Sequence, residues 1–216
     1  MKKRKAVLTA AVLLAAVWSA ACSRSAGKAW DASENSIYVA DDLSVKSAMV
    51  YTSEKENELY SADGLAEFAK EQIRAYNEEQ GASAEAENAK GKEKLPVALE
   101  RCSLEGKTGT LVFEYASADD FVKFSSENGD DTHTVTSLEI ADADSGTIPD
   151  LTFQTLSGKN VEPQTASETK GSHRIITDGS AKIYTEGKIL FVTDGVNVVS
   201  SYSAVTPEGT SCIIFK

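Results

Sequence analysis

The sequence of 216 residues has few of the side chains that usually mark metal, redox or catalytic sites: three Cys and two His. No two cysteines are spaced C-x-x-C, so thiol redox catalysis and thiolate zinc sites lose support. The two histidines, His133 and His173, are too few for a histidine-rich metal site, and neither lies in an H-E-x-x-H motif. No G-x-S-x-G motif of a serine hydrolase occurs either. We therefore predict no metal and no cofactor, and no catalytic residue can be named.

Positive charge is also scarce. The chain has 22 Lys and Arg against 33 Asp and Glu, which gives a net charge of −11. Residues 1–21 hold four of the cations and no acid, so a chain without them carries −15. Nucleic-acid backbones are bound by clustered Lys and Arg, so we expect no nucleic-acid partner. Adjacent acids, such as Asp130-Asp131, are most simply explained as solvated faces and caps.

Only one long apolar run occurs, and it lies near the start of the chain. Residues 1–21 have a basic stub, an apolar stretch from Ala6 to Trp18, and then small residues, which is typical of a secretory signal peptide. The stretch is shorter than the ~20 apolar residues that a helix needs to cross a hydrocarbon core. We expect residues 1–21 to be removed and the protein to be exported.

Small residues precede Cys22, and Ser19-Ala20-Ala21-Cys22 resembles the lipobox of bacterial lipoproteins. The resemblance implies that Cys22 is diacylated, becomes the mature N-terminus and anchors the protein to the outer face of the cell membrane. At ~0.8 kcal/mol per buried methylene, two acyl chains hold a domain on a bilayer where one chain exchanges. Lipoboxes favour Leu where Ser19 stands, so ordinary cleavage, giving a secreted protein with a free Cys22, is the alternative.

If Cys22 carries lipid, Cys102 and Cys212 remain as an even pair in an exported protein. A disulfide between them would close a loop of about 110 residues and, by chain entropy, stabilise the fold by on the order of 4 to 5 kcal/mol. Two buried thiols that pack as small apolar groups are an equal alternative.

Helical patterns occupy the middle of the chain. After Ser61, apolar residues recur at helical spacing until Gly81 provides a stop; they are Leu65, Phe68, Ala69, Ile73 and Tyr76. Ser117 is the N-cap of a second helix, which ends at residues 128–129. From Thr136 the sequence fits either a short third helix or a strand.

Strand patterns predict hairpins over residues 37–52 and 97–116. A further series lies at 151–156, 172–177, 181–184, 188–193, 196–202 and 210–215. We therefore expect an α+β fold: a mainly antiparallel sheet with two or three helices and a C-terminal β-meander, in a single domain over 36–216. The polar residues 22–35 predict a tether, and residues 82–94, without a large apolar side chain, predict an exposed loop.

Two segments have partial motifs. Gly106-Lys107-Thr108 resembles the end of a phosphate-binding loop, but Arg101 stands where the upstream Gly is needed and a strand pattern follows, so we predict a hairpin turn. Residues 142–146, with sequence D-A-D-S-G, are similar to a calcium loop. Their Gly comes one residue early and Phe153 replaces the closing Glu, which favours a solvated turn or helix end.

Residues Val97 to Phe124 are similar to stretches in uncharacterised surface lipoproteins of Gram-positive anaerobes. This resemblance implies an envelope location and no site residue besides Cys22. Because no catalytic motif is found, we expect a lipid-anchored extracytoplasmic domain that binds or scaffolds an unknown protein, wall polymer or small ligand. The alternative is an exported hydrolase of wall glycan or peptide that uses non-local acids, or His133 or His173 as a base.

Overall fold

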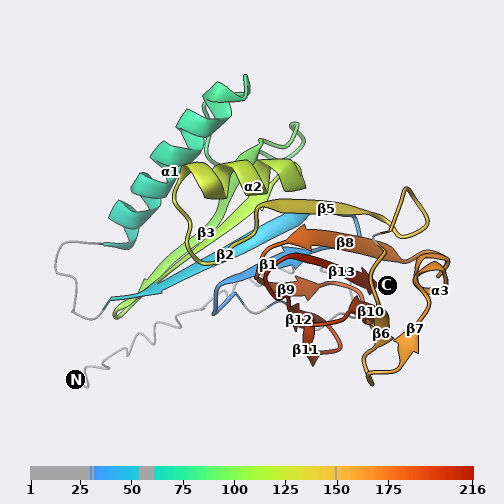
Figure 1. Cartoon of the computed structure of the whole chain (residues 1–216). Coiled ribbons are helices and arrows are strands. Elements are labelled where there is room, and N and C mark those ends of the chain that lie inside the picture. The colour runs from blue at the N-terminus through green and yellow to red at the C-terminus, as the bar shows by residue number, and fades with distance from the viewer. Residues whose placement is uncertain (1–29, 31, 54–60, 149) are drawn as a thin grey trace, which may run out of the picture.

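The computed structural model describes residue 30 and residues 32–53, 61–148 and 150–216. The expected signal peptide, Cys22 and most of the expected tether lie outside these residues. The described part combines helices with two mostly antiparallel sheets, so the predicted α+β class is confirmed (Figure 1).

The three helices of the described part are α1 (Ala62–Glu79), α2 (Ala118–Glu127) and α3 (Pro163–Ser167). The strands up to the middle of the chain are β1 (Ser36–Val39), β2 (Val45–Thr52), β3 (Val97–Glu105), β4 (Thr108–Tyr115), β5 (Ser137–Asp142), β6 (Phe153–Thr155) and β7 (Asn160–Val161). The remaining strands are β8 (His173–Asp178), β9 (Lys182–Thr185), β10 (Ile189–Thr193), β11 (Asn197–Ser200), β12 (Ser203–Val205) and β13 (Thr210–Phe215).

A seven-stranded sheet has the order β11-β12-β9-β1-β2-β4-β3, and a six-stranded sheet has the order β5-β8-β13-β10-β6-β7. Both predicted hairpins are present, as the antiparallel pairs β1–β2 and β3–β4. Strands β1 and β9 pair in parallel. Among the described residues, α1 and α2 lie on one face of the β2-β4-β3 half, while the second sheet packs beside the other half (Figure 1).

The C-terminal strand series is present, but it is divided between the sheets rather than arranged as one meander. Of strands β8 to β13, only β11 and β12 pair with a sequence neighbour. Within this series the chain first crosses between the sheets after β8, at Gly179, whose φ of +113° favours glycine. A Cβ there would overlap the Thr134 carbonyl oxygen. A strand pattern shows which face of a strand is buried but not which sheet it joins, and this is why the expected meander was wrong.

The segment from Thr136 forms a strand, β5, and not a third helix. Leu138 is buried and Ile140 packs beside it on the main core, so the alternation of apolar residues decides the structure. The short elements α3, β7 and β12 were not predicted.

One apolar core joins the two sheets and the helices. It contains Ile37 and Ile183 of the seven-stranded sheet, and Ile175 and Ile213 of the six-stranded sheet. A second cluster, around Phe153, covers the outer face of the six-stranded sheet. Burial shared in this way by both sheets is the expected organisation of a single domain.

The start of the described chain packs on the domain instead of acting as a tether. The Trp30 ring stacks on Tyr38 at 5.2 Å, and its Nε1 donates to Ser36 Oγ at 3.1 Å. Nearby, Lys182 Nζ donates to Glu34 Oε1 at 2.6 Å. Trp30 and residues 32–35 are therefore packed on the domain, and a tether over the residues before Trp30 stays a prediction.

Local capping and one buried amide position α1. Ser61 Oγ accepts from the Gly64 amide at 3.0 Å, as its predicted place at the helix start requires. Near the other end, the fully buried Asn77 side chain donates to Glu85 O and Val97 O and accepts from Val97 N. Asn77 thus fixes α1 and the irregular 82–94 segment to the first residue of β3.

Candidate functional site

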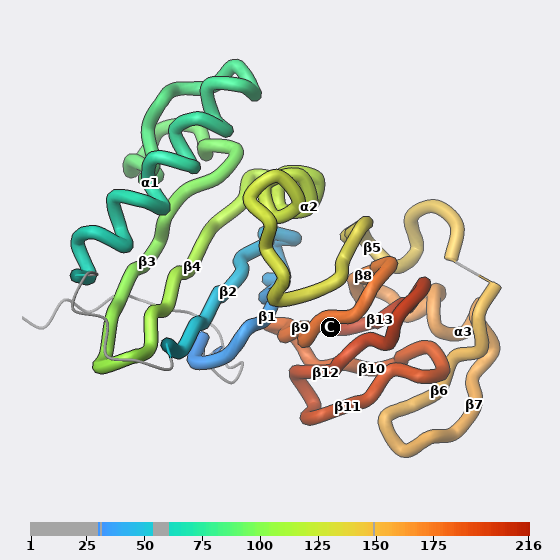
Figure 2. The backbone as a smooth tube through the Cα atoms, turned by 60° about the vertical axis from the view of Figure 1, so that its left-hand side comes forward, coloured from blue at the N-terminus to red at the C-terminus, as the bar shows by residue number. Residues whose placement is uncertain are grey.

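A hollow lies between α1 and the sheet, and we call it the α1 groove. Its outer part has a volume of about 500 Å³ and its inner part about 270 Å³. Met49, Phe68 and Leu111 line both parts, so the two are continuous. Figure 2 shows α1 running along β3, with α2 near one end of β4. The end of α2 and the residues after it line the inner part.

Strand alternation supplies the floor of the α1 groove. On β2, every second residue from Ser47 to Tyr51 faces the helices, and on β4 the same holds from Gly109 to Tyr115. The register places Met49 opposite Leu111, so two apolar side chains meet at the centre of the floor. A Cβ on Gly109 would lie 3.1 Å from Leu65 Cδ2, so the glycine gives α1 room to approach the outer floor.

The apolar stripe of α1 is only partly covered by the domain. Ala69, Ile73 and Tyr76 are buried, as its helical spacing predicts. Phe68 belongs to the same stripe, but 61 % of its surface is exposed, because the space between it and the sheet is the outer part of the groove. Sequence periodicity identified these residues as one face of the helix. It could not show that Phe68, on that face, is exposed instead of buried.

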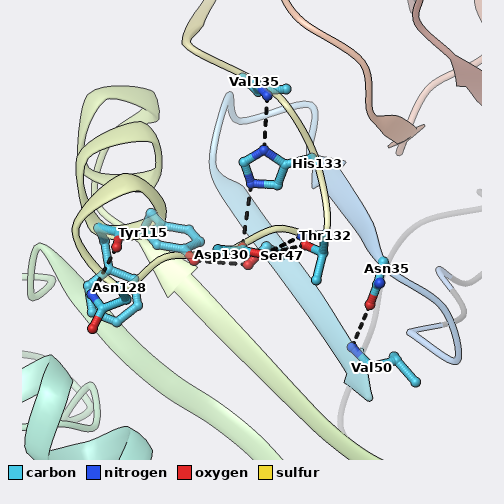
Figure 3. A network of polar contacts seen from close by, with 10 residues as sticks. Asn35, Ser47, Val50, Tyr115, Asn128, Asp130, Thr132, His133 and Val135 are labelled. Carbon is cyan, nitrogen blue, oxygen red and sulfur yellow. Dashed lines mark hydrogen bonds and ion pairs between the residues drawn. The ribbon is translucent and has the colours of Figure 1, made fainter. Parts of the chain in front are cut away.

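Polar groups close the inner end of the groove (Figure 3). Asp130 lines this end, and its Oδ1 accepts from the Thr132 amide at 2.9 Å and from Thr132 Oγ1 at 2.6 Å. Its Oδ2 lies 3.5 Å from His133 Nε2, a contact that is electrostatic rather than a short hydrogen bond. The Asp130 side chain is only 9 % exposed, so the expectation of a solvated carboxylate was wrong at this residue.

The carboxyl of Asp130 is held in its charged form. Burial acts to raise its pKa, but the contacts from His133 and Thr132 outweigh burial and bring the pKa below its ordinary value. Glu127 and Asn128 line the same end of the groove. The α1 groove thus has an apolar body and an anionic inner end.

Aromatic rings pack against one another in the inner wall. The Tyr76 ring meets Phe124 edge to face at 5.4 Å, and Phe113 lies 5.6 Å from the same Phe124 ring. Behind them the buried Tyr115 hydroxyl hydrogen-bonds Ser47 Oγ at 2.9 Å (Figure 3). A site that rests on strands and packed rings is already formed before a ligand arrives.

Each of the two histidines lies beside a carboxylate. His133 Nδ1 accepts from the Val135 amide at 3.1 Å, and Nε2 faces Asp130, so both ring nitrogens are engaged. His173 begins β8 in the other sheet, where its Nδ1 lies 3.0 Å from Asp142 Oδ1. In the described contacts neither imidazole reaches a hydroxyl or a thiol that it could activate, so no observation favours the hydrolase alternative. The residues that the structure describes contain no group of three His, Cys, Asp or Glu placed to hold a metal ion.

The cysteine pair is not joined. Cys102 and Cys212 are free thiols in different sheets. Cys102 lies under α1, where its Sγ contacts Ala62 O at 3.6 Å, whereas Cys212 is buried beside Phe153 on the outer face of the six-stranded sheet. Burial raises the pKa of both thiols, that of Cys212 to about 12, so neither is a reactive thiolate. Cys22 lies outside the described residues, and its lipidation stays a prediction.

The two partial motifs are turns. Gly106, with a φ of +59°, turns the chain between β3 and β4, so the hairpin prediction is confirmed. After β5 the Ser145 amide donates to Asp142 O at 3.0 Å, and Gly146 has a φ of +73°. Residues 142–146 therefore form a turn, in which the Asp142 carboxylate contacts His173.

No helix among the described residues combines the length and the hydropathy that crossing a membrane requires. In comparisons with known proteins, no family model, no curated protein and no solved structure matches the chain.

Proposed function

We propose that the protein is a lipid-anchored extracytoplasmic binding domain that takes the apolar part of an envelope ligand into the α1 groove. The observation that carries this proposal is Phe68, which stands 61 % exposed over a hollow whose floor, Met49 and Leu111, is itself apolar. Contiguous exposed apolar surface of this kind is typical of a binding site.

The dimensions of the groove suit a small ligand or a short extended chain. Its outer part, at about 500 Å³, lies within the roughly 300 to 1,000 Å³ of small-molecule sites. Full burial of a Phe side chain contributes ~1.5–3 kcal/mol, and most of that is unrealised at Phe68. A ligand that covers Phe68 would therefore gain about 1 to 2 kcal/mol from this side chain alone.

The envelope location is supported by the signal-peptide pattern and the lipobox-like Cys22. Docking of Trp30 on the sheet leaves residues 23–29 between the acylated cysteine and the domain. Seven residues span at most about 25 Å, so the anchor would hold the domain close to the bilayer. The α1 groove would then face ligands at or near the membrane surface.

Binding of a neutral fluorophore tests the site. N-phenyl-1-naphthylamine should bind the purified domain with saturable enhancement of its fluorescence. Replacing Leu111 by Trp fills the floor of the groove and should abolish this enhancement, provided that thermal unfolding shows a folded variant. The matched control is Val199→Trp, at a side chain that is 52 % exposed far along the same sheet. Equal binding by wild type and Leu111→Trp would contradict the proposal.

A further inference from the structure

We infer that the α1 groove selects a cationic amphiphile, a ligand whose apolar chain ends in an ammonium group that meets Asp130 at the inner end. The inference rests on the proposed function and adds the chemical class of the ligand. It follows from the charges and the hydrogen-bonding groups at the two ends of the groove.

The inner end offers negative charge and no positive charge. Asp130 and Glu127 both line it, and none of the described residues that line this part is Lys or Arg. His133 is the nearest ionisable partner, and it lies behind Asp130 on the segment between α2 and β5 rather than in the lining. Among the described residues that line the groove, the positively charged one is Lys107, and it belongs to the outer part.

The same end presents hydrogen-bond acceptors. Ser125 Oγ is buried beside the Tyr115 hydroxyl and makes no well-formed hydrogen bond with any described residue. Asn128 Nδ2 donates to Phe124 O at 2.8 Å, which leaves the Oδ1 atom of that amide to accept. Ser125, Asn128 and Asp130 all line this end of the groove, which is therefore rich in oxygen atoms that can accept. An ammonium group carries three N–H donors and no acceptor, so it matches this end.

Other ligand classes fit less well. The head of a fatty acid or a phosphate would meet an ionised carboxylate in a partly buried site, which is repulsive. A neutral alcohol could fill the apolar body, but it would remove water from Asp130 without supplying an opposite charge. The net charge of −11 also attracts cations and repels anions at long range.

Competition by three ligands with the same chain tests the inference. Octylamine, octanol and octanoate would each displace N-phenyl-1-naphthylamine from the wild-type domain at neutral pH. Octylamine should bind at least about tenfold more tightly than octanol, with octanoate the weakest, because an opposite charge at the inner end adds the energy of one charge-assisted contact.

Two variants locate the preference. Asp130→Asn retains an oxygen that can accept from Thr132 and removes the charge, so it should bring octylamine to the affinity of octanol and leave octanol unchanged. Glu71→Gln makes the same change of charge at an exposed position of α1 that does not line the groove. This control should keep the full preference for the amine. If Asp130→Asn does not fold, the wild-type series alone decides.

The outcomes separate the two proposals. If octanol or octanoate binds the wild type as tightly as octylamine, or if Asp130→Asn keeps the preference, the cation inference is overturned and the groove remains a site for apolar ligands. If neither the fluorophore nor any of the three ligands binds, the proposed function itself fails. The ammonium group could belong to the N-terminus of a peptide or to a non-peptide amine. Repeating the competition with leucine amide and N-acetyl-leucine amide tests the peptide source, because acetylation removes the ammonium group of the first compound.

Discussion

Phe68 and Ile73 lie on the same stripe of α1, and the structure predicts that their truncation has opposite consequences. Ile73 is fully buried, so Ile73→Ala should lower the free energy of unfolding by about 2 to 5 kcal/mol through lost burial and the cavity left behind. Phe68 is 61 % exposed, so Phe68→Ala forfeits only about two-fifths of the ~1.5–3 kcal/mol of a buried Phe. The better helix propensity of Ala returns about half a kcal/mol. We expect a net loss below about 1 kcal/mol.

Binding should show the reverse order. Phe68 lines both parts of the groove, so it would cover a bound ligand. Phe68→Ala should therefore weaken binding of the fluorophore by about tenfold, the equivalent of ~1.4 kcal/mol. Ile73 does not line the groove, and a folded Ile73→Val variant should bind as the wild type does. Urea unfolding followed by fluorescence gives the stabilities, and titration gives the affinities. A stability loss for Phe68→Ala as large as that for Ile73→Ala would make Phe68 a core residue and refute the reasoning.

Further predictions concern the scaffold and the anchor. Asn77→Ala should cost about 2 to 5 kcal/mol in urea unfolding, because it leaves the buried amide and carbonyl of Val97 without partners, whereas exposed Asn160→Ala should cost little. Burial raises the pKa of Tyr115 and Tyr76 above the ordinary value of 10. Their contribution to stability should therefore be constant below pH 10 and should fall above it by about 1 kcal/mol per pH unit for each tyrosine. Absorbance at 295 nm showing that all seven tyrosines ionise near pH 10 in the folded protein would contradict this. The native protein from membranes should have the mass of residues 22–216 plus a diacylglyceryl group on Cys22, with no shift on reduction, and an unmodified mass in the medium would remove the anchor.

Much of the fold could be predicted because its signals are local. The hairpins β1–β2 and β3–β4 follow from alternation and turn residues, and α1 and α2 follow from Ser61 and Ser117 as N-caps. The sheet order could not be predicted, since pairs such as β1–β9 join residues 146 positions apart through contacts that no local pattern encodes.

The candidate site was less accessible to sequence reasoning. The spacing of Leu65, Phe68 and Ile73 predicts one apolar face, but only the position of the sheet decides which part of it is covered. Asp130 and His133 are three residues apart, a spacing that also fits two solvated side chains. Their burial depends on the turn after α2, which brings them under the aromatic wall of the inner end. A signal that was present is Asn128-Gly129, which predicted where α2 ends and so where the inner end begins.

An NMR titration that follows methyl chemical shifts as ligand is added tests most directly whether the α1 groove is the binding site. Carbon-13 labelled domain would be titrated with octylamine, and the methyl groups of Met49, Leu65 and Leu111 followed along with those of Ile175 and Ile213 between the sheets. If the ligand binds in the groove, the methyl resonances of Met49, Leu65 and Leu111 should shift saturably with one common affinity. The resonances of the two buried isoleucines should not shift. Shifts confined to other surfaces, or none at millimolar ligand, would contradict it.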